Sequence, residues 1–166
     1  MKKIILTDAE PEFNPSVESL AKIITARLGL LPRKKGSTDS MHKIILEFYE
    51  RSKQANRQKK PELAVMTVEE MSFFAGITKQ TMYEYLERWL TIDFITRVTF
   101  FSTESGNTKK IVGYKLNGTT LEDAFSKTQA IISKNLAETD SYITELQRMI
   151  KNEKIKETIS LQTKKD

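Results

Sequence analysis

The polar run at positions 78–83, TKQTMY, carries side chains whose chemistry suits the reading of nucleic-acid bases. A glutamine can pair bidentately with adenine, a threonine can contact a thymine methyl group or a phosphate, and a lysine can reach guanine or a phosphate. A helix that begins with this run can present these groups to the major groove of DNA. The side chains expected to reach the groove are Thr78, Lys79, Gln80, Thr81 and Tyr83.

The surrounding sequence, residues 67–90, predicts two short helices joined by a tight turn. Thr67 and Glu70 fit a capping box at the start of the first helix. Gly76 suits the left-handed position that ends this helix, because glycine has no Cβ to clash. Thr78 then caps the second helix. The apolar stripe of the second helix comprises Met82, Tyr85, Leu86 and Trp89. This arrangement is typical of a helix-turn-helix.

Positive charge is concentrated just before this motif. The chain has a net charge of +5, and residues 33–60 contain nine basic and three acidic residues. The second helix itself carries Glu84 and Glu87, so attraction to phosphates must come from its flanks. The candidate phosphate contacts are Arg33, Lys34, Lys35, Arg57, Lys59, Lys60, Lys109 and Lys110. The same residues also fit solvated loops and an ordinary hairpin turn.

Further elements are expected on both sides of the motif. Asn14 and Pro15 fit the N-cap and first position of a helix that ends before Gly29. A second helix is expected from about residue 40 to Lys53. The apolar run 63–66 predicts a short strand, and residues 94–101 and 111–116 predict a hairpin around a polar turn. Helix, strand, two helices and hairpin is the element order of a winged helix.

A long helix is expected from Thr120 to the mid-150s. Apolar residues recur there at alternating spacings of four and three, which indicates a helix-pairing seam. The expected homodimer contacts are Leu121, Phe125, Ile132, Tyr142, Leu146 and Met149. Ile131, Leu136, Ile143 and Ile150 widen this apolar face. The alternative is a helix that folds back on residues 14–28 of its own chain.

Enzymatic and metal chemistry find little support in the sequence. It contains no cysteine and one histidine, His42, which is expected to be a surface or packing residue. No phosphate-binding loop or dinucleotide-binding turn is present. No catalytic residue, metal site or cofactor is therefore expected. No apolar run approaches the length of a membrane span or a secretory signal, so a cytoplasmic protein without membrane contact is expected.

Residues 40–116 resemble the winged helix-turn-helix superfamily of bacterial and archaeal transcription regulators. The resemblance depends on T-x-x-E-x-x-x-x-A-G-I-T-x-x-T-M-x-x-x-L from Thr67 to Leu86, followed by the hairpin. With the long helix, the layout is similar to that of PadR-like and MarR-like dimeric repressors. The resemblance implies a homodimer that binds specific double-stranded DNA sequences and regulates transcription. The two glutamates of the second helix depart from the more basic recognition helix usual in such regulators.

The expected fold is mainly α with a small β-hairpin. We expect an N-terminal arm and helix over 1–36, a winged helix-turn-helix domain over 37–118, a long coiled-coil-like helix over 119–157 and a disordered tail over 158–166. A DNA-binding adaptor in plasmid or chromosome partition or replication would use the same parts. A winged helix used for protein–protein assembly is the alternative from a different class, and binding of a small effector stays open.

Overall fold

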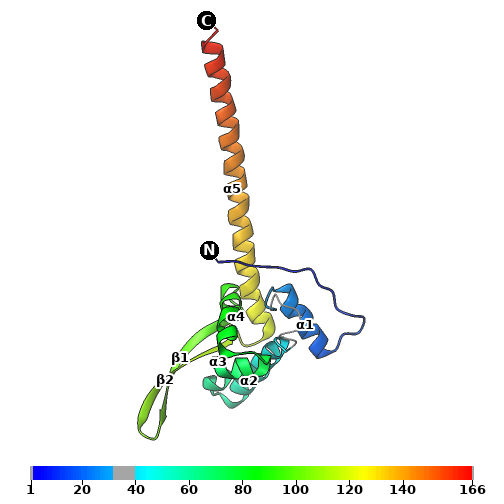
Figure 1. The fold of residues 1–166 in the computed structure, drawn as a ribbon, viewed down its shortest axis with the longest axis vertical. Helices are drawn as coiled ribbons and strands as arrows, with labels where there is room; N and C mark the ends of the chain where they lie inside the picture. The colour runs from blue at the N-terminus through cyan, green and yellow to red at the C-terminus, as the bar shows by residue number, and fades with distance from the viewer. Residues whose placement is uncertain (1, 32–39, 166) are drawn as a thin grey trace. The chain divides into compact units, whose positions relative to one another are not determined.

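The computed structural model describes residues 2–31 and 40–165. The chain forms two compact units, Met1–Gln129 and Ala130–Asp166. The described residues are mainly helical, with one antiparallel hairpin and a long C-terminal helix, as the sequence predicts (Figure 1). The elements in order are α1 (Val17–Arg27), α2 (His42–Gln58), the 3₁₀ helix η1 (Pro61–Ala64), α3 (Val68–Ala75), α4 (Lys79–Thr91), β1 (Ile95–Glu104), β2 (Asn107–Leu116) and α5 (Leu121–Thr163).

The two-helix hairpin of α3 and α4 forms as its local sequence predicts. The hydroxyl of Thr67 accepts from the backbone N–H of Glu70, and the Glu70 carboxylate accepts from the backbone N–H of Thr67 at 2.8 Å. Gly76 ends α3 with φ of 66°, and Thr78 caps α4 through the backbone N–H of Thr81. These bonds satisfy backbone groups that helix ends otherwise leave unpaired.

The apolar sides of α2, α3 and α4 meet in the core of the first unit. Trp89 of α4 is fully buried, and its ring packs edge to face on Phe94 with 6.1 Å between centroids. Of the stripe predicted for α4, Met82, Leu86 and Trp89 are buried and Tyr85 is half-buried. The largest fully buried side chains include Phe48, Ile44, Ile45, Met66, Met71, Met82 and Leu86.

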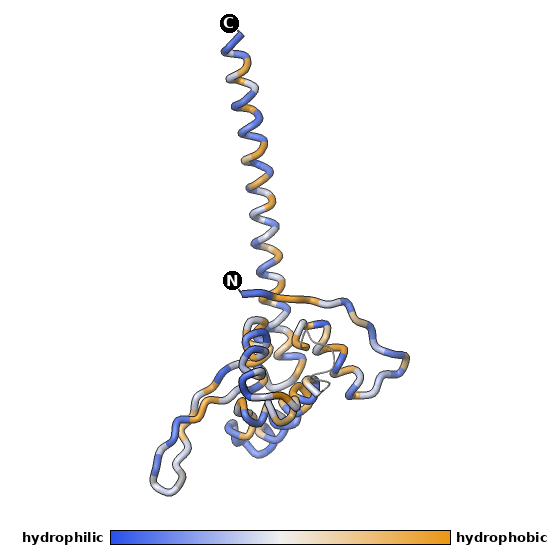
Figure 2. The backbone as a smooth tube through the Cα atoms, in the orientation of Figure 1, coloured by the Kyte–Doolittle hydropathy of each residue, from blue (hydrophilic) through white to orange (hydrophobic). Residues whose placement is uncertain are grey.

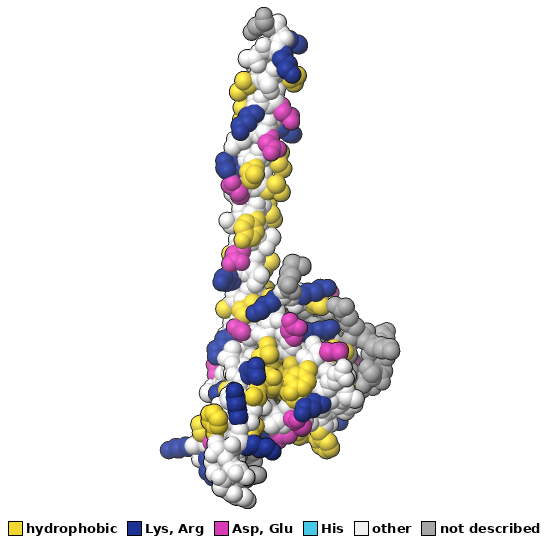
Figure 3. Space-filling view, turned by 60° about the vertical axis from the view of Figure 1, so that its left-hand side comes forward, with side chains coloured by type: hydrophobic (Ala, Val, Ile, Leu, Met, Phe, Trp, Pro, Cys, Tyr) yellow, Lys and Arg dark blue, Asp and Glu magenta, His cyan; other side chains and the backbone are white. Residues whose placement is uncertain are grey.

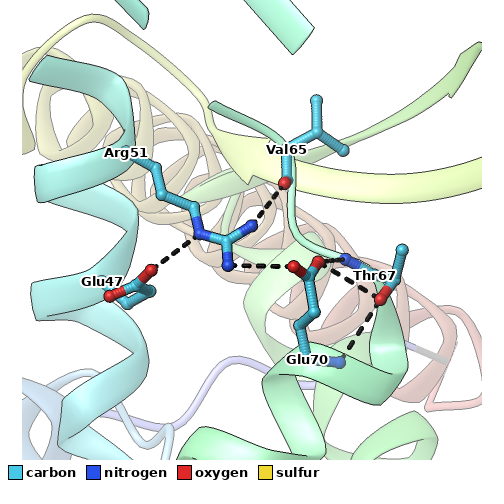
Figure 4. Close-up of polar contacts among 5 residues, drawn as sticks. All are labelled: Glu47, Arg51, Val65, Thr67 and Glu70. Carbon is cyan, nitrogen blue, oxygen red and sulfur yellow. Dashed lines mark hydrogen bonds and ion pairs between the residues drawn. The ribbon is translucent and has the colours of Figure 1, made fainter. Parts of the chain in front are cut away.

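Arg51 of α2 joins three segments around the start of α3 (Figure 4). Its guanidinium donates to Glu47 at 2.8 Å, to the Val65 carbonyl at 2.8 Å and to Glu70 at 3.0 Å. Burial acts to lower the pKa of Arg51, but the hydrogen bonds to Glu47 and Glu70 outweigh it and raise the pKa. The capping box of α3 is thereby tied to the middle of α2.

The start of α1 differs from the prediction. The N-cap is Ser16, whose hydroxyl accepts from the backbone N–H of Ser19 at 3.1 Å, whereas Asn14 has a left-handed φ of 58°. Asparagine tolerates this conformation better than most residues, so the chain turns at Asn14 before the helix begins.

His42 is almost completely buried, and its Nε2 lies 2.9 Å from the Glu18 carboxylate, which links α2 to α1.

Two predictions between α2 and α3 were wrong. Helix α2 continues to Gln58, and the buried Ala55 extends its covered side beyond Lys53. The strand predicted for residues 63–66 is instead η1 followed by a single antiparallel bridge between Met66 and Tyr114. Pro61 has no N–H to donate and suits the first position of η1. Leu63 and Ala64 belong to η1 and Val65 ends it, so Met66 is the residue of this run that pairs with the sheet.

The hairpin has a two-residue turn at Ser105 and Gly106, with φ values of 53° and 81°. Positive φ at both positions is typical of the turn that matches the right-handed twist of paired strands. The strands therefore continue to Glu104 and from Asn107, into the segment that the sequence predicts to be a longer polar turn.

Helix α5 also exceeds its predicted length. It reaches Thr163, and residues 158–163, expected to belong to a disordered tail, are helical. Neither proline nor glycine interrupts the chain after Gly118, and once begun, a helix lengthens at little cost. Figure 2 shows apolar residues recurring between polar ones along this helix.

Candidate nucleic-acid interface

The start of α4 exposes part of the polar run selected from the sequence. Lys79, Gln80 and Tyr83 are exposed, whereas Thr81 is half-buried. The backbone N–H of Thr81 lies 3.2 Å from the Thr78 hydroxyl, and the two threonine hydroxyls lie 2.8 Å apart. Both hydroxyls are therefore engaged in the cap. Gln80 and Tyr83 are the exposed side chains of this run that form no hydrogen bond or ion pair with another described residue.

An ion pair joins Lys79 to Glu69 in the first turn of α3. The hydrogen bond from Lys79 lowers the pKa of Glu69, and the same bond raises the pKa of Lys79. Both side chains are more than half exposed, so water screens the pair and its contribution to stability is small. Its stronger consequence is electrostatic, since the charge of Lys79 is compensated within the chain.

The rest of α4 adds no free positive charge. Glu84 and Glu87 are exposed, and Arg88 is half-buried. Arg88 donates to the Leu31 carbonyl at 3.1 Å, and its guanidinium carbon lies 5.2 Å from the centre of the Tyr85 ring. Arg88 therefore has a structural role, and α4 alone offers few contacts to a polyanion.

The hairpin presents its basic residues on two different faces. Side chains of directly paired residues share a face of the sheet, and neighbours along a strand alternate. Lys110 pairs with Phe101 and Lys109 with Ser102, so these two predicted phosphate contacts point to opposite faces. One face, named here the Arg97 face, carries Arg97, Thr99, Phe101, Lys110, Val112 and Tyr114.

Helix α4 packs against β1, and Tyr114 lies opposite Arg97 on the Arg97 face. Burial raises the pKa of the Tyr114 hydroxyl, the nearby charge of Arg97 opposes this, and nearby Tyr83 adds to it. Arg97 pairs directly with Tyr114 in the sheet, and Tyr83 on α4 is near enough to act on the pKa of Tyr114. Arg97 and Lys110 are exposed, and neither forms an ion pair with another described residue. In Figure 3, lysine and arginine side chains lie along the hairpin at the lower end of the view.

Arg97 is the residue that sequence analysis missed. It stands in an apolar strand, away from the cluster of lysines near the turn. The period of two along a strand, with Arg97 placed four residues before Phe101, is the signal that could have selected it.

The basic residues at the end of α2 belong to a different part of the surface. Arg57, Lys59 and Lys60 are exposed, and Lys59 lines a cleft of about 400 Å³ together with Lys115. Lys115 pairs with Thr96, on the face of the hairpin opposite Arg97. The structure thus separates this cluster from Tyr83 and Arg97. Arg33, Lys34 and Lys35 lie outside the described residues.

The residues predicted for homodimer contact divide into two groups. Leu121 is half-buried and packs against the core of its own chain, as do neighbouring turns at Ala124 and Thr128, while Phe125 is partly exposed. Ile132 is half-buried. Tyr142, Leu146 and Met149 are exposed. The apolar stripe of α5 is thus covered by its own chain near the start of the helix and exposed to solvent from residue 133 onward.

No family model matches this chain, and comparisons with curated proteins and with solved structures found no match. Among residues 2–31 and 40–165, no helix combines the length and hydrophobicity needed to cross a membrane. In the same residues, no three His, Asp or Glu side chains are grouped as a metal site would require.

Proposed function

We propose that residues 40–118 form a winged helix-turn-helix domain, in which α3 and α4 are the helix-turn-helix and the β1–β2 hairpin is the wing. The order of α2, α3, α4 and the hairpin supports this assignment, as does the capped turn at Gly76. The bridge from Met66 to Tyr114 adds a third short segment beside β2, which fixes the base of the wing next to α3.

The function that this geometry favours is binding of double-stranded DNA. The observation that carries the proposal is that α4 packs against β1, with Tyr83 exposed on α4 and Arg97 exposed on β1. In this arrangement Gln80 and Tyr83 read base edges in the major groove, while Arg97 and Lys110 contact phosphates. The wing therefore supplies the free positive charge that α4 lacks.

The protein is proposed to act as a homodimer, most simply as a transcription regulator. The exposed apolar residues of α5 support self-association, because a helix with one apolar side gains stability when a partner covers it. A DNA-binding adaptor in plasmid or chromosome partition or replication would require the same surface and the same dimer.

Fluorescence anisotropy with random duplex DNA across a salt series tests this proposal. Arg97→Ala and Lys110→Ala should each weaken binding to all sequences and reduce the slope of log affinity against log salt by about one. Lys109→Ala is the matched control, because it removes the same charge one residue away on the opposite face. No binding even at low salt would contradict the proposal.

Recognition of a specific DNA sequence is tested separately, by selecting bound duplexes from a pool of random DNA. The natural protein should enrich a common site, and Gln80→Ala should relax the preference at one position while the fold is retained. Lys79→Ala should have a smaller effect, because Glu69 already engages that side chain. A pool that shows no enrichment would contradict sequence-specific recognition but not phosphate binding.

A protein–protein assembly module is the second candidate. Glu84 and Glu87 are exposed on α4, and Phe73 of α3 is 82% exposed, a combination that suits a protein partner better than DNA. This candidate predicts no DNA binding at any salt concentration in the anisotropy experiment, so the same titration separates the two functions.

A further inference from the structure

The open part of α5 contains a regular apolar seam. Ile132, Leu136, Thr139, Ile143, Leu146 and Ile150 follow one another at spacings of 4, 3, 4, 3 and 4 residues. At 3.6 residues per turn they occupy roughly 80° of the circumference of the helix. We name these six residues the α5 seam. Five of them are large and apolar.

The structure shows where this seam begins to need a partner. Thr128 is completely buried in the first unit, so its own chain covers the preceding part of the stripe. Leu136, Ile143 and Leu146 are 66%, 57% and 58% exposed. A line of large apolar side chains exposed to this degree over several turns is typical of an interaction surface.

We infer that a second copy of this chain covers the α5 seam and that the two helices run antiparallel. This inference rests on the proposed self-association and adds the seam and the direction. The spacing of the seam reads the same from either end, as an antiparallel pair requires. Ile132 then lies opposite Ile150 of the partner subunit, Leu136 opposite Leu146 of the partner subunit and Thr139 opposite Ile143 of the partner subunit.

Charge at the two ends of α5 favours the antiparallel direction. Residues 151–165 contain five lysines and two glutamates, whereas residues 119–129 contain two acidic residues and one lysine. A parallel pair would bring the two basic ends together. An antiparallel pair brings each basic end alongside the acidic start of the other helix, where the charges attract.

The residues that continue the seam beyond Ile150 point to the same direction. They are Glu153 and Glu157, at spacings of three and four. In a parallel pair each glutamate would face its own copy, and like charges at such positions destabilise a coiled coil. In the antiparallel register, Glu153 faces the uncharged Gln129 of the partner subunit, so Glu153 does not meet its own copy.

Engineered disulfides test the direction, because the natural chain contains no cysteine. The variants are Leu136→Cys and Leu146→Cys, oxidised alone and as an equal mixture after subunit exchange. The antiparallel pair should give covalent dimers in the mixture and few with either variant alone. Ala137→Cys mixed with Glu145→Cys is the matched control. The proposed register relates these two positions in the same way as Leu136 and Leu146, but they lie on the side of the helix away from the seam and should not cross-link.

Each alternative result has a separate meaning. Covalent dimers formed by each single variant with itself would show a parallel pair and overturn the inference. A dimer in sedimentation without cross-links in the mixture would show a different interface and also overturn it. A protein that sediments as a monomer at every concentration would remove the proposed homodimer as well. DNA binding is measured by anisotropy without oxidation, and circular dichroism confirms that the variants remain helical.

Discussion

Helices α4 and α5 share a pattern of apolar residues but differ in what covers it. In α4, Met82, Leu86 and Trp89 are buried by α2, α3 and the base of the hairpin. In α5, the stripe is buried at Thr128, while the residues from Leu136 to Ile150 are exposed. The period of a helix predicts that one side will be covered, but it does not say whether the same chain or another molecule provides the cover.

This difference has an energetic consequence. Residues covered within the chain contribute to folding at any protein concentration. Residues covered by a second copy contribute only when the copies associate, so their effect depends on concentration. Four substitutions separate these contributions and the electrostatics that accompany them.

The largest effect is expected from Trp89→Ala, which removes a fully buried ring from the core. The free energy of unfolding should fall by roughly 3–5 kcal/mol, independent of protein concentration. Denaturant titration checks this value. Trp89→Phe should cost much less, because the indole N–H has no hydrogen-bond partner among the described residues and its loss leaves no acceptor unpaired. Equal losses for both variants would contradict this account of the core.

Ile143→Ala should act on association instead of folding. The dimer should weaken by about 2 kcal/mol, or roughly thirtyfold in dissociation constant, as measured by sedimentation equilibrium. Ile159→Ala is the matched control, because Ile159 is similarly exposed but lies on the other side of the helix from the α5 seam. Equal effects of the two substitutions would show that the seam does not define the interface.

Glu70→Gln should change the acid sensitivity of the α3 cap. Burial acts to raise the pKa of Glu70, but hydrogen bonds from Thr67 and Arg51 outweigh it and lower the pKa below 4.5. A lowered folded pKa gives stability above pH 4.5 that is lost as pH falls through the folded value. The variant should therefore be less stable at pH 7 and lose less stability between pH 5 and about pH 3.

Thermal unfolding across this pH range checks the prediction. Glu145→Gln in α5 is the control, since the hydrogen bond from Arg148 lowers the pKa of Glu145 but the group is fully exposed. The stability that Glu145→Gln loses as the pH falls from 5 to about 3 should be close to that lost by the natural protein. A similar change in both variants would show that the cap has no special role in acid stability.

The smallest effect is expected from Glu69→Gln, which releases Lys79 from its ion pair. DNA affinity should rise a few-fold, and the salt slope should increase by about one, because Lys79 becomes free to contact a phosphate. Glu138→Gln in α5 makes the same change of charge away from the proposed interface. Unchanged affinity in Glu69→Gln would show that Lys79 does not approach the DNA.

Local sequence determined the helix ends around the turn at Gly76. The capping box of Thr67 and Glu70, the left-handed glycine and the cap at Thr78 depend on groups three or four residues apart. Such hydrogen bonds form in the same way in most surroundings, so their pattern can be recognised directly. The mainly helical chain, the hairpin and the long last helix follow from the same kind of short-range evidence.

Tertiary structure decided which of these elements share a surface. The pairing of Lys79 with Glu69 joins residues ten apart, and the exposed residues Tyr83 and Arg97 belong to elements, α4 and β1, that pack against each other. The single bridge at Met66 and the burial of Thr128 likewise depend on distant segments. Spacing along a chain fixes the direction of a side chain within its own element. The neighbour that it meets depends on how whole elements pack, and that packing minimises the free energy of the entire core.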